Sequence, residues 1–247
     1  MSADAPDGAG RIALPEIDST NAEGFRRGGG PLWITAGLQT AGRGRRARPW
    51  VSPRGNFHGT LVLHPVEPPE TVALRSFVAA VALRDAFVAA TGLPDAFALK
   101  WPNDVLLNGG KVAGILLESQ SLGTPDATLC IGMGVNLIAA PDASLVEPGA
   151  LAPVSLLQDT GKRITPEAFL NVLAPAYARW EAIFTAEGFA PIRAHWLAHA
   201  VRLGQPIKAR TGTTTHDGIF ETIDATGNLI LRTPSATLAI PAAEVFF

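Results

Sequence analysis

Apolar and polar residues alternate over short stretches in the first quarter of the chain, which is the spacing of half-buried β-strands. Three stretches show it: "RIALPEID" from residue 11, "LWITAGLQT" from residue 32 and "NFHGTLVLH" from residue 56. Between the first two, "DSTNAEGFRRGGG" offers Ser19 or Thr20 as a helix cap and ends on three glycines. This pattern predicts a strand, a short helix and two further strands.

A helical spacing of apolar residues begins after the third strand. Residues 69–91 have the strongest helical pattern in the chain. Its predicted apolar face consists of Val72, Phe77, Val81, Phe87 and Val88. Three more helices are predicted near residues 155–160, 165–187 and 189–200.

Strands are predicted again in the middle of the chain. The segment "AFALKWPNDVLLNGGKVAGILLESQ" from residue 96 holds two or three of them, and the pair Asn108-Gly109 suits a two-residue hairpin turn. Another strand is expected over residues 128–138, and Cys130 inside it is expected to be a small buried apolar residue. Helices and strands thus share the larger part of the chain.

The pattern changes near residue 200. From there, short alternating stretches are separated by turn residues about every eight positions, as in a small β-barrel. We therefore expect a flexible tail over residues 1–10, an α/β domain of catalytic size over 11–200 and a barrel of SH3 size over 201–247.

Composition limits the classes of protein to consider. The chain has 247 residues, 47% of them hydrophobic, and a mean hydropathy of +0.20, so it is long enough for a substantial core. The start lacks a charged segment followed by an apolar core, and the longest apolar stretch is interrupted by Arg75, Arg84 and Asp85. These features predict a cytoplasmic protein without a membrane span.

The stretch "QTAGRGRRARPW" from residue 39 packs four arginines into six positions, although the net charge is −2 and the pI is about 6.2. DNA-binding proteins usually carry a broad basic surface, so this cluster is expected to meet a small anion. Glycines let the backbone approach a ligand, and guanidinium groups bind phosphate or carboxylate in pairs. The stretch is not a P-loop, and "GMGVN" at residue 132 lacks the third glycine of a dinucleotide-binding turn.

The segment "KWPNDVLLNGGKVAGILLES" from residue 100 gathers groups that suit chemistry. Pro102 favours a turn after a strand, Asn103 and Asp104 follow it, and the hairpin returns Lys111 and Gly114 toward the same place. The spacing alone also fits a surface hairpin with solvated charges. A carboxylate, an amide and an ammonium nevertheless converge here.

Taken in order, "DSTN", "QTAGRGRRARPW", "KWPNDVLLNGGKVAGILLE" and "GMGVNL" resemble the biotin protein ligases, over roughly residues 11–247. The resemblance implies an α+β fold of the class II synthetase type, a mixed sheet flanked by helices, with a small C-terminal SH3-like barrel. It is closest to the short form without the N-terminal DNA-binding domain, since only a tail precedes the first strand.

The resemblance also implies an activity and its ligands. Biotin's carboxylate attacks the α-phosphorus of ATP to give biotinyl-5'-AMP, and a lysine of a biotin carboxyl carrier protein then takes the biotin. The implied ligands are biotin, ATP and Mg²⁺, with no DNA and no membrane as partners, and a homodimer is one arrangement that it allows.

Site roles carry over on the matching positions. The catalytic residues implied are Lys111, Arg43, Arg45 and Asp104, with Asp104 also beside Mg²⁺. The biotin-binding residues implied are Ser19, Thr20, Asn21, Gln39, Arg43, Gly44, Arg45, Lys111 and Gly114, where Gly114 leaves room for the ligand. The ATP-binding residues implied are Arg45, Arg46, Arg48, Trp50, Asn103 and Asn136, where Trp50 stacks on adenine.

Ala47 departs from the pattern, because a glycine usually follows GRGRR in this family. If that position has a positive φ, alanine there costs on the order of 1 kcal/mol. Two other functions stay open: a lipoate or octanoate ligase with the same architecture, and a biotin-sensing module that does not adenylate. A protein that only binds biotin does not need phosphate-binding groups such as the clustered arginines and Lys111, and their presence favours the ligase.

Overall fold

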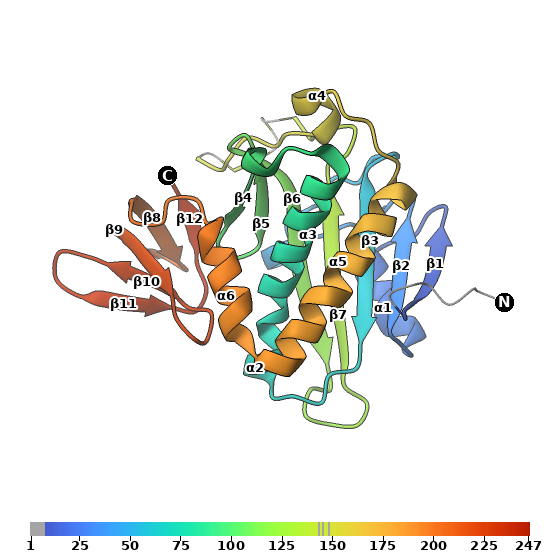
Figure 1. The fold of residues 1–247 in the computed structure, drawn as a ribbon, viewed down its shortest axis with the longest axis horizontal. Helices are drawn as coiled ribbons and strands as arrows, with labels where there is room; N and C mark the ends of the chain where they lie inside the picture. The colour runs from blue at the N-terminus through green and yellow to red at the C-terminus, as the bar shows by residue number, and fades with distance from the viewer. Residues whose placement is uncertain (1–7, 143, 145, 148) are drawn as a thin grey trace.

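The structure is a computed structural model of the chain, and it describes residues 8–142, 144, 146–147 and 149–247 (Figure 1). Most of the predicted N-terminal tail, residues 1–7, lies outside the described residues. A seven-stranded mixed sheet forms the centre, and only its β1–β2 pair is parallel. Its strands, in spatial order, are β1 (Gly10–Leu14), β2 (Leu32–Ala36), β3 (Phe57–Leu63), β7 (Thr128–Val135), β6 (Gly110–Gln120), β5 (Asp104–Leu107) and β4 (Phe97–Lys100).

Helices cover both faces of this sheet. Two long helices, α3 (Arg75–Thr91) and α5 (Pro166–Glu187), lie side by side over one face, with α6 (Phe189–Ala198) next to them (Figure 1). The first helix, α1 (Thr20–Arg27), packs on the opposite face over Cys130 and Val62, and Gly24 provides the close approach. The predicted mixed sheet flanked by helices is therefore confirmed.

Cys130 is fully buried, and burial raises the pKa of its thiol to about 12. The neutral thiol behaves as a small apolar side chain between α1 and the sheet, as the sequence predicts.

The helix predicted over 69–91 is divided at Leu74 into α2 (Pro69–Ala73) and α3. Nearly all sides of α3 are buried, because it lies between the sheet and two helices. The two arginines that interrupt its apolar run have polar partners inside the protein. Arg75 pairs with Glu67 and Glu181, and Arg84 donates to backbone carbonyl groups.

The central hairpin has the predicted turn. Asn108 and Gly109 have φ values of 49° and 86°, which is the left-handed region that a tight two-residue turn requires. The segment from residue 96 holds three strands, and the strand predicted over 128–138 ends at Val135. Beyond it, the short helix α4 (Leu156–Thr160) starts at the N-cap Ser155, as expected near that position.

Residues after α6 form a second, five-stranded antiparallel sheet, consistent with a small barrel. Its core is continuous with that of the larger sheet, and Trp101 donates to the carbonyl of Gly227. Within the described ranges, none of the helices has the length and apolar character to cross a membrane. The strands are β8 (Pro206–Thr211), β9 (Thr214–Ile223), β10 (Leu229–Arg232), β11 (Thr237–Ile240) and β12 (Glu244–Phe246).

Candidate active site

A cavity of about 550 Å³ lies where the start of α1, the arginine loop, the β5–β6 hairpin and the start of β12 meet. Every site residue predicted from the sequence lines it, although these residues come from segments more than a hundred positions apart. They are Ser19, Thr20, Asn21, Gln39, Arg43, Gly44, Arg45, Arg46, Arg48, Trp50, Asn103, Asp104, Lys111, Gly114 and Asn136.

Polar groups at the start of α1 form one end of the cavity. Ser19 caps the helix, and both the backbone N–H and the hydroxyl of Thr20 donate to Oε1 of Gln39, at 2.8 and 3.0 Å. Thr60 lies beneath, and its hydroxyl donates to Oδ1 of Asn21 at 2.6 Å and lies 2.8 Å from the hydroxyl of Thr20. Ser19, Thr20, Asn21 and Thr60 are buried, so this end presents a few fixed polar groups of the kind that orient a small neutral ligand.

Charged groups converge on the β5–β6 hairpin. The Nζ atom of Lys111 lies 2.7 Å from the Asp104 carboxylate, and Nζ of Lys100 lies 3.8 Å from it. Burial lowers the pKa of Lys100, while the charge of Asp104 opposes that shift. Sequence reasoning missed Lys100 as a site residue, although a rare lysine at the head of "KWPND" was the available signal.

Asn103 has a structural role in this arrangement. Its side-chain amide donates to the backbone carbonyl of Ile115 at 2.6 Å, and its backbone carbonyl accepts from the N–H of Ile115. Asn103 therefore holds the turn before β5 against β6. Asn136 is similarly engaged, because its buried amide donates to the carbonyl of Val154.

The arginines of the loop have carboxylate partners that the sequence did not reveal. Arg46 pairs with Glu244 of β12 at 3.3 Å, and Arg48 pairs with Glu147 at 2.9 Å and with Glu244. Arg210 of β8 joins the same two carboxylates. Acidic groups from distant segments thus offset the repulsion among the clustered guanidinium groups.

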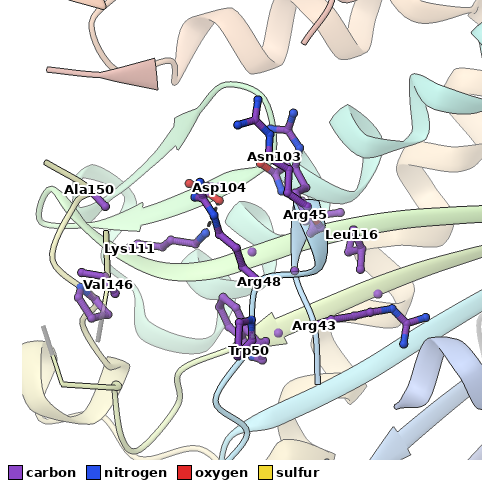
Figure 2. A pocket seen from close by; sticks show the side chains of 18 of the residues that line it. Arg43, Arg45, Arg48, Trp50, Asn103, Asp104, Lys111, Leu116, Val146 and Ala150 are labelled. Carbon is purple, nitrogen blue, oxygen red and sulfur yellow. Dashed lines mark hydrogen bonds and ion pairs between the residues drawn. The ribbon is translucent and has the colours of Figure 1, made fainter. Parts of the chain in front are cut away.

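Arg43 and Arg45 face different parts of the cavity. Arg45 donates to the carbonyl of Ala243, and burial lowers the pKa of its guanidinium against the opposing charge of Asp104. Arg43 points away from Lys111 and Asp104, as Figure 2 shows. It forms a two-point ion pair with Glu118 of β6, whose carboxylate oxygens accept at 3.1 and 3.0 Å.

Trp50 is half-buried. A Cβ atom on Gly134 would lie 2.4 Å from the Trp50 indole, and one on Gly114 would lie 3.2 Å from it. The two glycines therefore leave room for the indole against β6 and β7. The open side of Gly114, expected to face the ligand, faces Trp50 and Lys111 in this structure. The ammonium of Lys111 lies 5.5 Å from the Trp50 ring centre, within cation–π range.

Ala47 has a positive φ, as its departure from the family pattern suggested. The values are 57° for Arg46 and 56° for Ala47, in the short turn at the tip of the loop. For residues other than glycine, this left-handed backbone conformation costs roughly 1–2 kcal/mol per residue. The loop is therefore held in a conformation that its own sequence does not favour.

Comparison with known proteins places these observations in a family. The sequence model of the Biotin/lipoate A/B protein ligase family matches residues 17–136, and that of the biotin protein ligase C-terminal domain matches residues 203–247. The chain is 57% identical to the biotin–[acetyl-CoA-carboxylase] ligase of Paracoccus denitrificans over 95% of this chain and 99% of that protein. It is 32% identical to the bifunctional ligase/repressor BirA of Bacillus subtilis, over 86% of this chain and 65% of that one.

A solved structure gives the same result. The biotin protein ligase of Aquifex aeolicus, in complex with biotin and ATP, superposes with a TM-score of 0.82 at 25% identity, over 96% of this chain and 97% of that one. The motifs, the fold and the lining of the cavity agree with these similarities. The chain belongs to the biotin protein ligase family.

Proposed function

We propose that this protein activates biotin with ATP and transfers it to a lysine of a biotin carboxyl carrier protein. The observation that carries the proposal is that one cavity joins a neutral polar end, at Thr20 and Gln39, to a cationic end at Lys111. Biotin has the matching shape: a neutral ureido ring at one end of an apolar body and a carboxylate at the other.

Two steps follow. In the first, an oxygen of the biotin carboxylate attacks the α-phosphorus of ATP, and pyrophosphate leaves as biotinyl-5'-AMP forms. In the second, the amine of the carrier lysine attacks the carbonyl carbon of that anhydride, an amide forms, a proton is lost and AMP leaves. The enzyme forms no covalent intermediate, so positioning and charge stabilisation supply the catalysis.

The polar end of the cavity supports the proposed biotin-binding roles. Ser19, Thr20 and Gln39 would hold the ureido group, with Asn21 beside them. Their hydrogen bonds to one another fix their positions before the ligand arrives. Such preorganisation reduces the ordering that binding requires.

The cationic end of the cavity supports the proposed catalytic roles. Lys111 would neutralise the carboxylate and the α-phosphate as they approach, and Arg45 would stabilise charge on the phosphate oxygens. Trp50 would provide a stacking face for adenine, with Arg46, Arg48 and Asn136 along the nucleotide. Arg43 and Gly44 would close the loop over the bound adenylate.

Mg²⁺ fits this site in a limited way. Asp104 is the acidic side chain among the predicted site residues, and its Oδ2 lies 3.8 Å from Lys100, beyond hydrogen-bonding range. Mg²⁺ is usually held by one or two carboxylates together with substrate phosphates. Asp104 would therefore hold an ion carried by the triphosphate, which would neutralise phosphate charge.

Several wider proposals accompany this function. We place the domain boundary near residue 200, supported by the change of sheet between α6 and β8.

The need for ATP and for a carrier protein favours the cytoplasm, and a pI of about 6.2 favours a protein without DNA as a partner. A homodimer is supported by the position of β1 at the edge of the sheet, and sedimentation at several concentrations tests it.

Pyrophosphate release with ATP and Mg²⁺ tests the function when biotin, lipoate and octanoate are compared. We expect release with biotin, followed by biotin transfer when a carrier domain is added. Release with lipoate or octanoate but not with biotin would favour the lipoate ligase. Biotin binding without release would favour a sensing module.

A further inference from the structure

Glu118 lies near the end of β6 and contacts Asn21 and Arg43, two residues that line the cavity. Its Oε2 accepts from Nδ2 of Asn21 at 2.8 Å and from the Arg43 guanidinium at 3.0 Å, and its Oε1 accepts from Nε of Arg43 at 3.1 Å. One carboxylate thus joins α1, the arginine loop and the sheet. The reaction described above assigns it no role.

The contact with Asn21 is directional. Oδ1 of Asn21 accepts from the Thr60 hydroxyl, so Nδ2 is left to face Glu118. Gly132 makes this arrangement possible, because a Cβ atom there would lie 2.5 Å from Oδ1 of Asn21. The hydrogen bond from Thr60 therefore fixes the orientation of the buried Asn21 side chain, and Asn21 in turn holds the Glu118 carboxylate.

The hydrogen bonds continue from Asn21 back to the loop. Thr60 also bonds Thr20, Thr20 bonds Gln39, and Nε2 of Gln39 donates to the Ser52 hydroxyl at 3.1 Å. Ser52 in turn donates to the carbonyl of Trp50 at 3.2 Å. A continuous polar chain therefore starts at Arg43, runs through the predicted biotin pocket and returns to the loop at Trp50.

The loop between those two points is closed on itself. The N–H of Trp50 donates to the carbonyl of Gly42 at 2.9 Å, and the N–H of Gly44 donates to the carbonyl of Arg48 at 2.8 Å. Fixing one side chain near its base therefore fixes the whole loop. The Arg43 guanidinium points away from Lys111 and Asp104 (Figure 2), and it pairs with Glu118 instead, which suits an anchor.

We infer that Glu118 is a positioning residue, which anchors the arginine loop through Arg43 and ties its closure to the groups that hold biotin. The inference rests on the proposed function. A charge-assisted two-point pair gives a fixed geometry as well as attraction. Loop closure over the adenylate therefore depends on Glu118, although Glu118 does not touch the reacting atoms.

Glu118→Gln tests this, because the amide keeps the size and the contact with Asn21 but loses the charge that holds Arg43. We expect the biotin KM and the rate of biotinyl-AMP release to rise about tenfold, the usual size of a lost charged hydrogen bond. The melting temperature should stay close to wild type. Release is measured by filtration of the preformed complex without carrier.

A double-mutant cycle with Arg43→Gln identifies the route. In the Arg43→Gln background, Glu118→Gln should change adenylate release by less than about twofold, because the partner is already lost. Gln120→Ala is the matched control, since Gln120 is exposed and lies on the same face of β6 two residues further on. This control should match wild type.

Two results would overturn the inference. One is wild-type biotin KM and adenylate release in Glu118→Gln. The other is a lower melting temperature with equal changes in both KM values, which would make Glu118 a merely structural residue. If the wild-type chain itself makes no biotinyl-AMP, the proposed function fails and the role of Glu118 with it, so the two failures are distinguished in one assay.

Discussion

The ammonium of Lys111 lies 2.7 Å from the carboxylate of Asp104, across the hairpin formed by β5 and β6. Both side chains are partly buried in the wall of the cavity, at 30% and 13% exposure. A solvated surface hairpin would leave its lysine extended into water. This pair instead holds the ammonium at the cavity wall, where the proposed mechanism brings a carboxylate and a phosphate together.

Lys111→Ala should therefore remove most of the adenylation activity. Loss of a cation placed at developing charge costs about 3 kcal/mol, or two orders of magnitude in rate. Biotin-dependent pyrophosphate exchange measures the adenylation rate. Lys208→Ala is the control, because Lys208 lies on the surface of β8 with 64% of its side chain exposed. An active and stable Lys111→Ala enzyme would remove Lys111 from the mechanism.

Trp50→Ala should raise the ATP KM about tenfold, since stacking on a base contributes roughly 1–3 kcal/mol. Gly134→Ala provides a matched change, because its methyl group would lie 2.4 Å from the indole and displace the ring without deleting it. Both variants should affect ATP more than biotin in steady-state kinetics. Equal loss of both substrates without unfolding would contradict the stacking role.

Ala47→Gly should relieve the backbone at the tip of the loop. Ala47 has a φ of 56°, and glycine adopts this region freely, so we expect the free energy of unfolding to rise by up to about 1 kcal/mol, less the added entropy of the unfolded chain. Denaturant titration measures this change. Ala41→Gly, just before the loop, is a suitable control, and a larger gain there than at residue 47 would contradict the explanation.

Loop closure should depend on ligand. Hydrogen exchange across residues 42–48 should slow when biotin and a non-hydrolysable ATP analogue are added, because the adenylate site orders the loop and excludes water. Arg45→Gly should still make biotinyl-AMP but release it, so that nearby lysines become biotinylated without the proper carrier. Equal exchange with and without ligands would leave the arginines as a static phosphate site.

Acid should destabilise the protein through His58. Burial lowers the pKa of this histidine, against a hydrogen bond with the carbonyl of Pro53. Above about pH 6.5 the imidazole is neutral in both states, but below it the unfolded chain takes up a proton first, so stability falls until the lower folded-state pKa is reached. The free energy of unfolding should therefore fall less between about pH 7 and pH 5 in His58→Gln than in wild type.

His64→Gln is the control for that experiment, because His64 is exposed at the end of the same strand. The burial of His199 also lowers its pKa, so a smaller slope should remain in His58→Gln. An unchanged slope in His58→Gln would show that His58 does not contribute.

The sequence by itself determined most of the helices and strands, and the motif residues that line the cavity. Strand and helix periods are local, and so are the turn residues Asn108 and Gly109, because neighbouring side chains and backbone conformation dictate them. The motif residues around Lys111 and in the arginine loop could also be identified, since residue type and spacing within a motif belong to the sequence itself. Their gathering into one cavity agrees with that interpretation.

Only the tertiary structure decided the partners of those groups. Glu118, Glu147 and Glu244 stand far along the chain from the arginines that they pair with, and no local period links them. Trp50 is half-buried because Gly114 and Gly134 lie side by side on β6 and β7, a register that strand pairing sets. Contacts between distant segments depend on the order and register of the strands in the sheet. The pattern of residues along the chain does not show which distant segments lie next to each other.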